Sequence, residues 1–262
     1  MPTTDAAIIT GASGGMGACL AREMARRGTA LLLVARRIER LEALARELGD
    51  TAPCFTLAMD LADTPAVGST LTAALQKHAL TPVALFNNAG AGCYSTFLEQ
   101  PLELHERLWR INHLAAVETI RAVLPSMLDR RRGHVINICS MSSKIGPWGH
   151  SAYAASKAAL ANITQALQAE HPPERSGVHF TLVNPGIVKT EFFEHEQGRR
   201  LWPTVAKRAI PAETVARKVV ELLDRPRGQL CVPWFYRFIE AIEAISPTLA
   251  QRIVAAQSRP RA

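Results

Sequence analysis

The chain has 262 residues, is 48% hydrophobic and carries a formal net charge of +7, from 30 Lys and Arg against 23 Asp and Glu. The basic charge permits an anionic ligand, but the basic residues occur in small scattered groups without interleaved aromatics, so we do not expect nucleic-acid binding. The five cysteines lack metal-ligand spacing, so we expect no bound metal. No signal peptide precedes the first apolar run and no run of eighteen apolar residues occurs, so we expect a cytoplasmic chain.

Short apolar runs alternate with amphipathic segments along the chain. We expect strands at residues 6–9, 30–34, 54–57, 83–86, 135–138, 178–183 and 230–232. Helices are expected at residues 18–27, 38–48, 65–77, 102–128, 151–170 and 212–223. Alternation of this kind is typical of parallel strands joined by helices, and strands that are apolar on both faces need helices on both sides. The sequence thus predicts an α/β fold with a doubly wound, parallel, seven-stranded sheet.

A glycine-rich turn links the first strand to the first helix. Its sequence, Thr10-Gly11-Ala12-Ser13-Gly14-Gly15-Met16-Gly17, allows close approach of a pyrophosphate, whose charge is favoured by the N–H groups at the helix start. The second strand ends in Ala35-Arg36-Arg37, where an acidic residue would repel a 2′-phosphate and a guanidinium would bind it. These segments predict a dinucleotide site with NADP(H) preferred and NAD(H) possible.

Further motifs follow in order along the chain. They are Asp60 after the third strand, Asn87-Asn88-Ala89-Gly90 after the fourth, Tyr153-x-x-x-Lys157 on the fifth helix, and Pro185-Gly186 with Thr190 after the sixth strand. With T-G-x-x-x-G-x-G at Thr10–Gly17, this order resembles the short-chain dehydrogenase/reductase family over about residues 5–232.

The resemblance implies a Rossmann fold and an enzyme that acts on CH–OH groups with NAD(P). It also implies cofactor contacts at Gly11, Ser13, Gly15, Met16, Gly17, Arg36, Arg37, Asp60, Leu61, Asn88, Ala89, Gly90, Tyr153, Lys157, Pro185, Gly186, Val188 and Thr190.

The spacing of Tyr153 and Lys157 places both side chains on one helix face. A tyrosine hydroxyl has a pKa of about 10, and we expect the ammonium, with the positive oxidised nicotinamide, to lower it toward neutrality. Ser140 follows the fifth strand, with Ser142 and Ser143 as nearby alternatives.

The resemblance implies that Ser140 positions the substrate oxygen and that the backbone carbonyl of Asn112 holds a water linked to Lys157. The implied catalytic set is Asn112, Ser140, Tyr153 and Lys157. During reduction the nicotinamide would deliver hydride to the carbonyl carbon while Tyr153 protonates the oxygen.

The expected substrate contacts are mostly apolar or aromatic: Ser140, Ser142, Trp148, Tyr153, Phe192 and Phe193. This composition favours a small hydrophobic ketone, aldehyde or alcohol. The segment at about 187–210 lacks periodicity and contains Phe192, Phe193 and Trp202, so we expect a lid there.

We assign residues 1–233, including the lid, to the dinucleotide-binding domain, and residues 234–262 to a C-terminal helical extension. The extension is interpreted as a flap over the pocket, an oligomer contact or, least favoured, a peripheral membrane contact. The resemblance implies a homodimer or homotetramer. Two other functions stay open: a 3-oxoacyl thioester reductase and a non-catalytic dinucleotide-binding regulatory protein. An intact Tyr153 and Lys157 argue against the regulatory protein.

Overall fold

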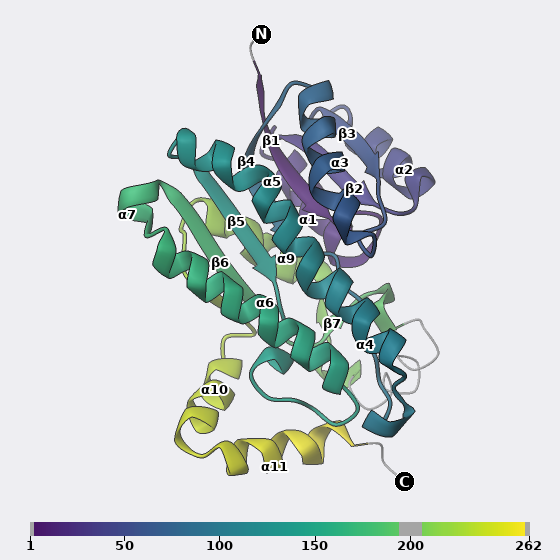
Figure 1. The fold of residues 1–262 in the computed structure, drawn as a ribbon, viewed down its shortest axis with the longest axis vertical. Coiled ribbons are helices and arrows are strands. Elements are labelled where there is room, and N and C mark those ends of the chain that lie inside the picture. The colour runs from purple at the N-terminus through teal and green to yellow at the C-terminus, as the bar shows by residue number, and fades with distance from the viewer. Residues whose placement is uncertain (1–2, 194–205, 260–262) are drawn as a thin grey trace.

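A parallel sheet of seven strands forms the centre of the chain, of which the computed structural model describes residues 3–193 and 206–259. The strands are β1 (Thr4–Thr10), β2 (Ala30–Ala35), β3 (Cys54–Ala58), β4 (Leu80–Asn87), β5 (Gly133–Ile138), β6 (Val178–Pro185) and β9 (Gln229–Val232). The strand order in the sheet is β3-β2-β1-β4-β5-β6-β9. The chain runs from β1 outward to one edge, returns to the centre at β4, and then runs outward to the other edge (Figure 1). In sheets of this order, ligands bind outside the carboxyl ends of the strands, where the direction changes between β1 and β4.

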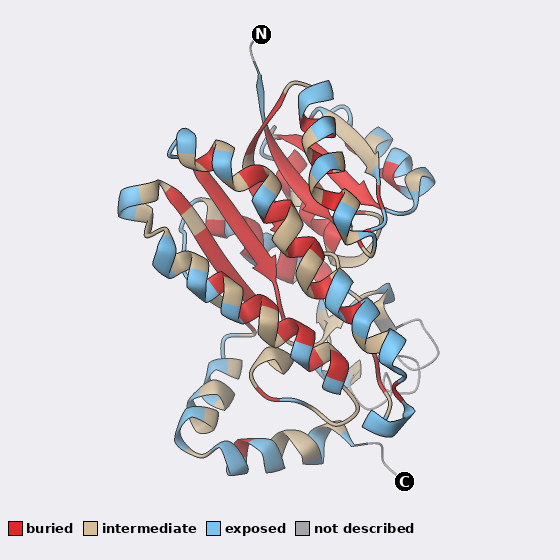
Figure 2. Ribbon diagram, in the orientation of Figure 1, coloured by how far each residue is buried: buried red, intermediate tan, exposed pale blue. Residues whose placement is uncertain are grey.

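Helices cover both faces of the sheet. On one face, α1 (Gly15–Ala25), α2 (Ile38–Leu48) and α9 (Ala212–Val220) bury an apolar cluster. On the other lie α3 (Thr64–Lys77), α5 (Ala115–Asp129) and α6 (Ser151–Glu170). Strands β2 and β5 are buried along their whole length, whereas the edge strand β3 is half-buried (Figure 2). The predicted doubly wound, seven-stranded parallel sheet is confirmed.

The regular helix expected at 102–128 is interrupted, and that prediction is wrong at its centre. Helix α4 (Leu102–Trp109) and α5 are joined by a π-helical turn, Arg110–Leu114, in which the Ala115 N–H bonds to the carbonyl of Arg110. Such turns insert one residue into the helical hydrogen-bond pattern and often mark functional positions. Asn112 lies in this turn, where its side chain bonds to neighbouring segments and compensates for the altered backbone.

The segment expected to form the lid is described only at its two ends. Strand β7 (Val188–Lys189) pairs in parallel with β8 (Ile210–Pro211), and a 3-10 turn, Glu191–Phe193, follows β7. Residues 194–205, including Trp202, lie outside the described residues, so the lid stays a prediction.

Two helices occupy the expected C-terminal extension. Helices α10 (Tyr236–Ile245) and α11 (Pro247–Ser258) lie beyond the carboxyl ends of the strands, and a short helix, α7 (Pro173–Ser176), lies at the opposite end (Figure 1). Within residues 3–193 and 206–259, no helix has the length and apolar content needed to cross a membrane.

Candidate active site

Three candidate catalytic side chains meet at the carboxyl end of β5. Ser140 follows this strand and caps a 3-10 turn, Met141–Ser143, by accepting the Ser142 N–H at 3.1 Å. The Ser140 hydroxyl lies close enough to Tyr153, in the first turn of α6, to lower the pKa of the phenol. Of the three nearby serines, Ser143 instead donates to the backbone carbonyl of Ser140 at 2.7 Å. The structure therefore brings Ser140 to Tyr153, as the sequence predicted.

Lys157 is buried one helical turn after Tyr153. Its Nζ donates to the backbone carbonyl of Ile138, at the end of β5, at 2.8 Å. Burial lowers the pKa of this ammonium, and Cys139 opposes that shift. A Cβ on Gly90 would lie 3.5 Å from Lys157 Nζ and 3.2 Å from Asn112 Oδ1. Gly90 thus lies directly against Lys157 and Asn112, where a larger residue would crowd both.

Burial governs the protonation of Tyr153 in the chain alone. Desolvation raises the pKa of its hydroxyl above the ordinary value, Ser140 lowers it, and Cys139 and Cys93 raise it. Desolvation outweighs the effect of Ser140. The expected lowering, which involves the oxidised nicotinamide, stays a prediction. At neutral pH the phenol is protonated.

Asn112 uses its side chain to connect α6 with the loop after β4. The amide donates to the carbonyl of Ala91 at 2.9 Å and to the hydroxyl of Ser156 at 3.0 Å, while its oxygen accepts the Ala91 N–H at 2.8 Å. These bonds satisfy a side chain that is 1% exposed. Its implied role, a water held by the backbone carbonyl, stays a prediction. Ser156 was not among the predicted residues, although it lies within the Tyr153-to-Lys157 segment.

The glycine-rich turn after β1 is packed tightly against the loop after β4. Asn88 Nδ2 donates to the Thr10 carbonyl at 2.9 Å, and the Thr10 hydroxyl accepts the N–H groups of Asn88 and Ala89 at 3.0 and 3.1 Å. A Cβ on Gly17 would lie 2.2 Å from the Gly11 carbonyl oxygen, and one on Gly11 would lie 2.9 Å from Ala89 Cα. The backbone forms the surface here, as close approach of a pyrophosphate requires.

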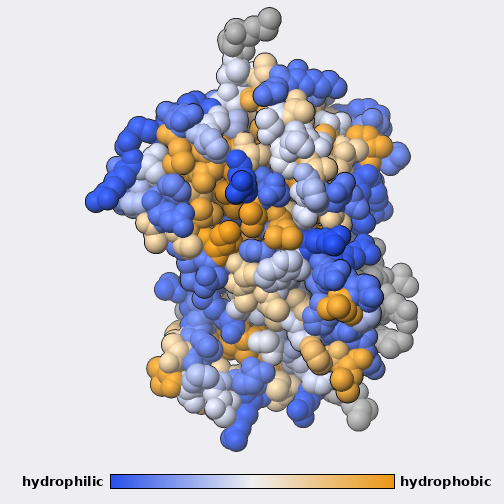
Figure 3. All heavy atoms as spheres, viewed as in Figure 1, coloured by the Kyte–Doolittle hydropathy of each residue, from blue (hydrophilic) through white to orange (hydrophobic). Residues whose placement is uncertain are grey.

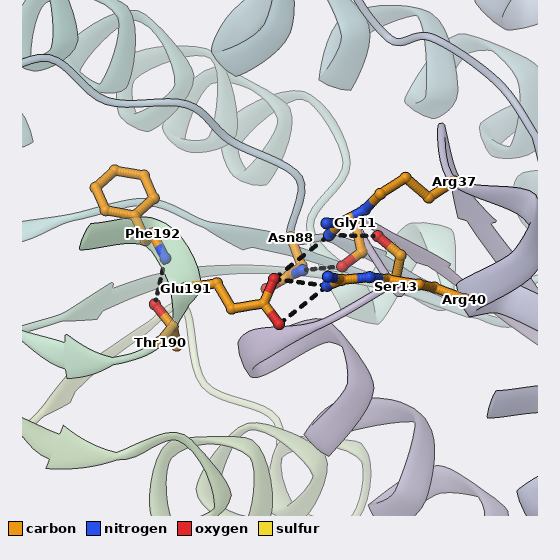
Figure 4. A network of polar contacts seen from close by, with 8 residues as sticks. All are labelled: Gly11, Ser13, Arg37, Arg40, Asn88, Thr190, Glu191 and Phe192. Carbon is orange, nitrogen blue, oxygen red and sulfur yellow. Dashed lines mark hydrogen bonds and ion pairs between the residues drawn. The ribbon is translucent and has the colours of Figure 1, made fainter. Parts of the chain in front are cut away.

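A carboxylate and two guanidinium groups meet above this turn (Figure 4). Arg40 Nη1 lies 2.7 Å from Glu191 Oε2, and Arg37 Nη2 lies 3.5 Å from the same oxygen and 3.4 Å from the Ser13 hydroxyl. Sequence analysis missed Arg40 and Glu191. Arg40 lies one turn after Arg37 on α2, a spacing that signals a shared face, whereas nothing local distinguishes Glu191.

Arg36 is exposed, and within residues 3–193 and 206–259 it forms no hydrogen bond or ion pair. Asp60, expected at the adenine ring, accepts the Ala62 N–H at 3.0 Å and so stabilises its own turn.

The remaining predicted cofactor residues lie at the same end of the sheet. Leu61 is buried, and Met16 packs on the cluster beneath α1. Pro185 ends β6, the Gly186 N–H donates to the Val232 carbonyl at 2.7 Å, and Val188 lies in β7. Thr190 Cβ lies 3.1 Å from the position of a Cβ on Gly15. Thr190 thus packs directly against the glycine-rich turn.

Aromatic side chains surround Tyr153. The Phe192 ring lies 5.9 Å and the His150 ring 6.1 Å from that of Tyr153. The Tyr94 ring lies 5.3 Å from those of both His150 and Trp148. Phe193 lies in the turn Glu191–Phe193 beside Phe192. Of the predicted substrate residues, the structure thus places Phe192 against Tyr153 and links Trp148 to it through intervening rings.

Helix α11 packs behind these rings. The backbone N–H of Trp148 donates to the Ser258 hydroxyl at 2.9 Å, and the Tyr94 hydroxyl donates to the Ser258 carbonyl at 3.0 Å. Gln251 Nε2 donates to the Gly146 carbonyl at 3.0 Å. Among the three interpretations of the extension, these contacts favour the flap over the pocket, which stays a prediction.

Comparisons with known proteins agree with this geometry. A family model described as short chain dehydrogenase matches residues 5–200. Mouse dehydrogenase/reductase SDR family member 7B is 30% identical over 264 residues, covering 96% of this chain and 80% of that protein. An alcohol dehydrogenase from the archaeon Thermococcus sibiricus, complexed with 5-hydroxy-NADP, has a TM-score of 0.76 at 28% identity, covering 87% of this chain and 95% of that one. A short-chain dehydrogenase/reductase from Burkholderia phymatum in complex with NAD shares the fold, with a TM-score of 0.86 at 22% identity and coverage of 99% and 97%.

Proposed function

Because the chain belongs to the short-chain dehydrogenase/reductase family, and so is an oxidoreductase acting on CH–OH groups with NAD(P), we propose that it interconverts a hydrophobic carbonyl compound and its alcohol with NADP(H). The observation that carries this proposal is the approach of the Ser140 hydroxyl to Tyr153, with Lys157 one helical turn away. A hydroxyl pair of this kind can bind one carbonyl oxygen from two sides.

The residues around the glycine-rich turn fit a dinucleotide. When bound, the nicotinamide cofactor supplies the hydride for reduction or accepts it for oxidation. The bare backbone between Gly11 and Gly17 would hold the pyrophosphate, and Thr190 and Lys157 would hold the nicotinamide end. Arg36 and Arg37, at the end of β2, would bind a 2′-phosphate, as the alcohol dehydrogenase in complex with a hydroxylated NADP also suggests.

In the proposed mechanism Tyr153 is the proton donor for reduction. Because its pKa is raised by burial, the phenol retains its proton at neutral pH until a carbonyl oxygen accepts it. Ser140 positions that oxygen and shares its developing charge. Lys157, held by the Ile138 carbonyl, would stabilise the phenolate left after transfer. For oxidation the same groups act in reverse.

The substrate class follows from the rings of Phe192, His150 and Tyr94 around Tyr153. A hydrophobic ketone, aldehyde or secondary alcohol therefore fits better than a charged sugar.

We also propose that the chain forms a homodimer or homotetramer. Figure 3 shows hydrophobic side chains gathered over the face formed by α5 and α6, on a surface that is otherwise largely hydrophilic. The half-buried apolar side chains of these helices include Leu124, Leu128 and Leu167. Patches of this kind commonly mark contacts between subunits.

The function is tested by measuring NADPH oxidation against a panel of hydrophobic ketones, with acyl thioesters and sugars in parallel. We expect turnover with the ketones. Turnover restricted to acyl thioesters would favour the thioester reductase instead, and cofactor binding without turnover on any substrate would favour a regulatory protein.

A further inference from the structure

A carboxylate of the chain itself lies over the glycine-rich turn. Both oxygens of Glu191 lie 3.3 Å from the position that a Cβ on Gly14 would take. The same carboxylate accepts Arg40 Nη1 at 3.0 and 2.7 Å and lies 3.5 Å from Arg37 Nη2 (Figure 4). The two arginines therefore already hold an anion at the place where a cofactor phosphate is expected.

The ion pair joins two parts of the chain that are distant in the sequence. Arg37 and Arg40 begin α2, directly after β2, whereas Glu191 follows Thr190 on the segment after β6. Thr190 lies against Gly15 on the other side of the turn. The Glu191 carboxylate thus lies beside the place where a dinucleotide along the glycine-rich turn would bind.

The pair is weak enough to be displaced. The Arg40 and Glu191 side chains are 48% and 43% exposed, and exposed pairs of this kind contribute little net stability because water and salt screen them. A phosphate monoester has more charge and more acceptor oxygens than a carboxylate, and it can bond both guanidinium groups at once. NADP(H) carries such a group on its ribose and NAD(H) does not.

We propose that Glu191 and Arg40 determine cofactor choice by competition: Glu191 holds Arg37 and Arg40 until the 2′-phosphate of NADP(H) displaces it. NAD(H), which has no group to replace the carboxylate on these arginines, leaves the pair intact. This inference rests on the proposed binding of NADP(H).

The test compares the dissociation constants of NADPH and NADH for the full chain and its Glu191→Gln variant. Removing the competing charge frees both guanidinium groups, so we expect NADPH to bind about fivefold more tightly, the size of one exposed ion pair. NADH should change by less than about twofold, since it makes no use of these arginines. The double variant Glu191→Gln, Arg40→Gln should lose most of the gain for NADPH.

Glu42→Gln provides a matched control. This glutamate is exposed on α2 and, among the described residues, forms no hydrogen bond or ion pair, yet its replacement changes the net charge equally. Both cofactors should bind it as they bind the wild type. Thermal unfolding of each variant checks that the fold is intact, and Glu191→Asp, with a shorter reach, should give an intermediate gain.

Three results would overturn the inference. An equal gain for both cofactors would mean that Glu191 acts only on the shared pyrophosphate. Weaker NADPH binding would mean that the carboxylate supports the bound cofactor, and a gain that survives Arg40→Gln would remove Arg40 from the site. A wild type that binds neither cofactor would instead refute the proposed function, and this inference with it.

Discussion

The hydroxyl of Tyr94 donates to the backbone carbonyl of Ser258 at 3.0 Å, which joins the loop after β4 to the last turn of α11. The Tyr94 ring packs edge-on against the Trp148 ring, and the backbone N–H of Trp148 donates to the Ser258 hydroxyl. Because the Tyr94 ring also contacts His150, which contacts Tyr153, the C-terminal helix supports the rings around Tyr153.

Tyr94→Phe should therefore weaken the binding of bulky hydrophobic ketones. The lost hydrogen bond is worth at most about 1 kcal/mol to the position of α11, so we expect the KM for such a ketone to rise by at most about fivefold. The dissociation constant of NADPH should not change, because the glycine-rich turn lies elsewhere. Steady-state kinetics with large and small ketones, beside cofactor titration, measure both effects. If stability falls while every KM is unchanged, α11 has only a structural role.

Tyr153→Phe removes the proposed proton donor and leaves the ring in place. General acid catalysis contributes about 10²- to 10⁴-fold, so kcat should fall by that factor. The hydroxyl lies near Ser140 and not at the glycine-rich turn, so the dissociation constant of NADPH should change by less than about twofold. Single-turnover reduction and cofactor titration separate the two effects. Activity close to that of the wild type would exclude the assigned role.

The fold was predictable because burial constrains its strands strongly. Strands that lie inside a doubly wound sheet must be apolar on both faces, and the runs at 30–34 and 135–138 are contained in β2 and β5. The π-helical turn at Arg110–Leu114 was not predictable, since its residues continue the helical pattern on both sides. It is recognisable only from the tertiary bonds of Asn112 to Ala91 and Ser156.

The site was predictable where its residues are close in the sequence. Tyr153 and Lys157 share a helix, and the glycine-rich turn is continuous, so spacing alone places them. The ion pair of Glu191 with Arg40 joins residues that are far apart in the sequence, and no local pattern indicates such a contact. The raised pKa of Tyr153 in the chain alone was not predictable either, because proximity to an ammonium is visible in a sequence and desolvation is not.

Arg36→Asp should shift cofactor preference toward NADH. The change removes a guanidinium at the end of β2 and adds a carboxylate that repels a 2′-phosphate. We expect the ratio of kcat/KM for NADPH over NADH to fall about tenfold, equivalent to one charge-assisted hydrogen bond. Arg46→Asp, an equal charge change at the far end of α2, should leave the ratio unchanged. An unaltered ratio in Arg36→Asp would assign the phosphate to Arg37 and Arg40 alone.

His134 should make the protein less stable in acid. Its ring is buried in β5, and Nε2 lies 2.8 Å from the Thr181 hydroxyl, which donates its own hydrogen to the Arg227 carbonyl. Nε2 therefore donates, and the ring is neutral. Burial, with a smaller contribution from His179, lowers the pKa of His134 to about 3. The unfolded chain, with a pKa of about 6.5, binds the proton more readily.

The sign of the pH effect follows from this difference. Because only the unfolded chain binds the proton between about pH 6.5 and about 3, the free energy of unfolding falls progressively as the pH drops through this range. At pH 5 the loss is about 2 kcal/mol. In His134→Gln this titration is absent, so the free energy of unfolding should fall less between pH 7 and pH 5 than in the wild type. Urea denaturation at both pH values measures the difference, which isolates His134 from the other histidines. Equal losses in the two proteins would show that this ring is protonated without cost, in conflict with its burial against Thr181.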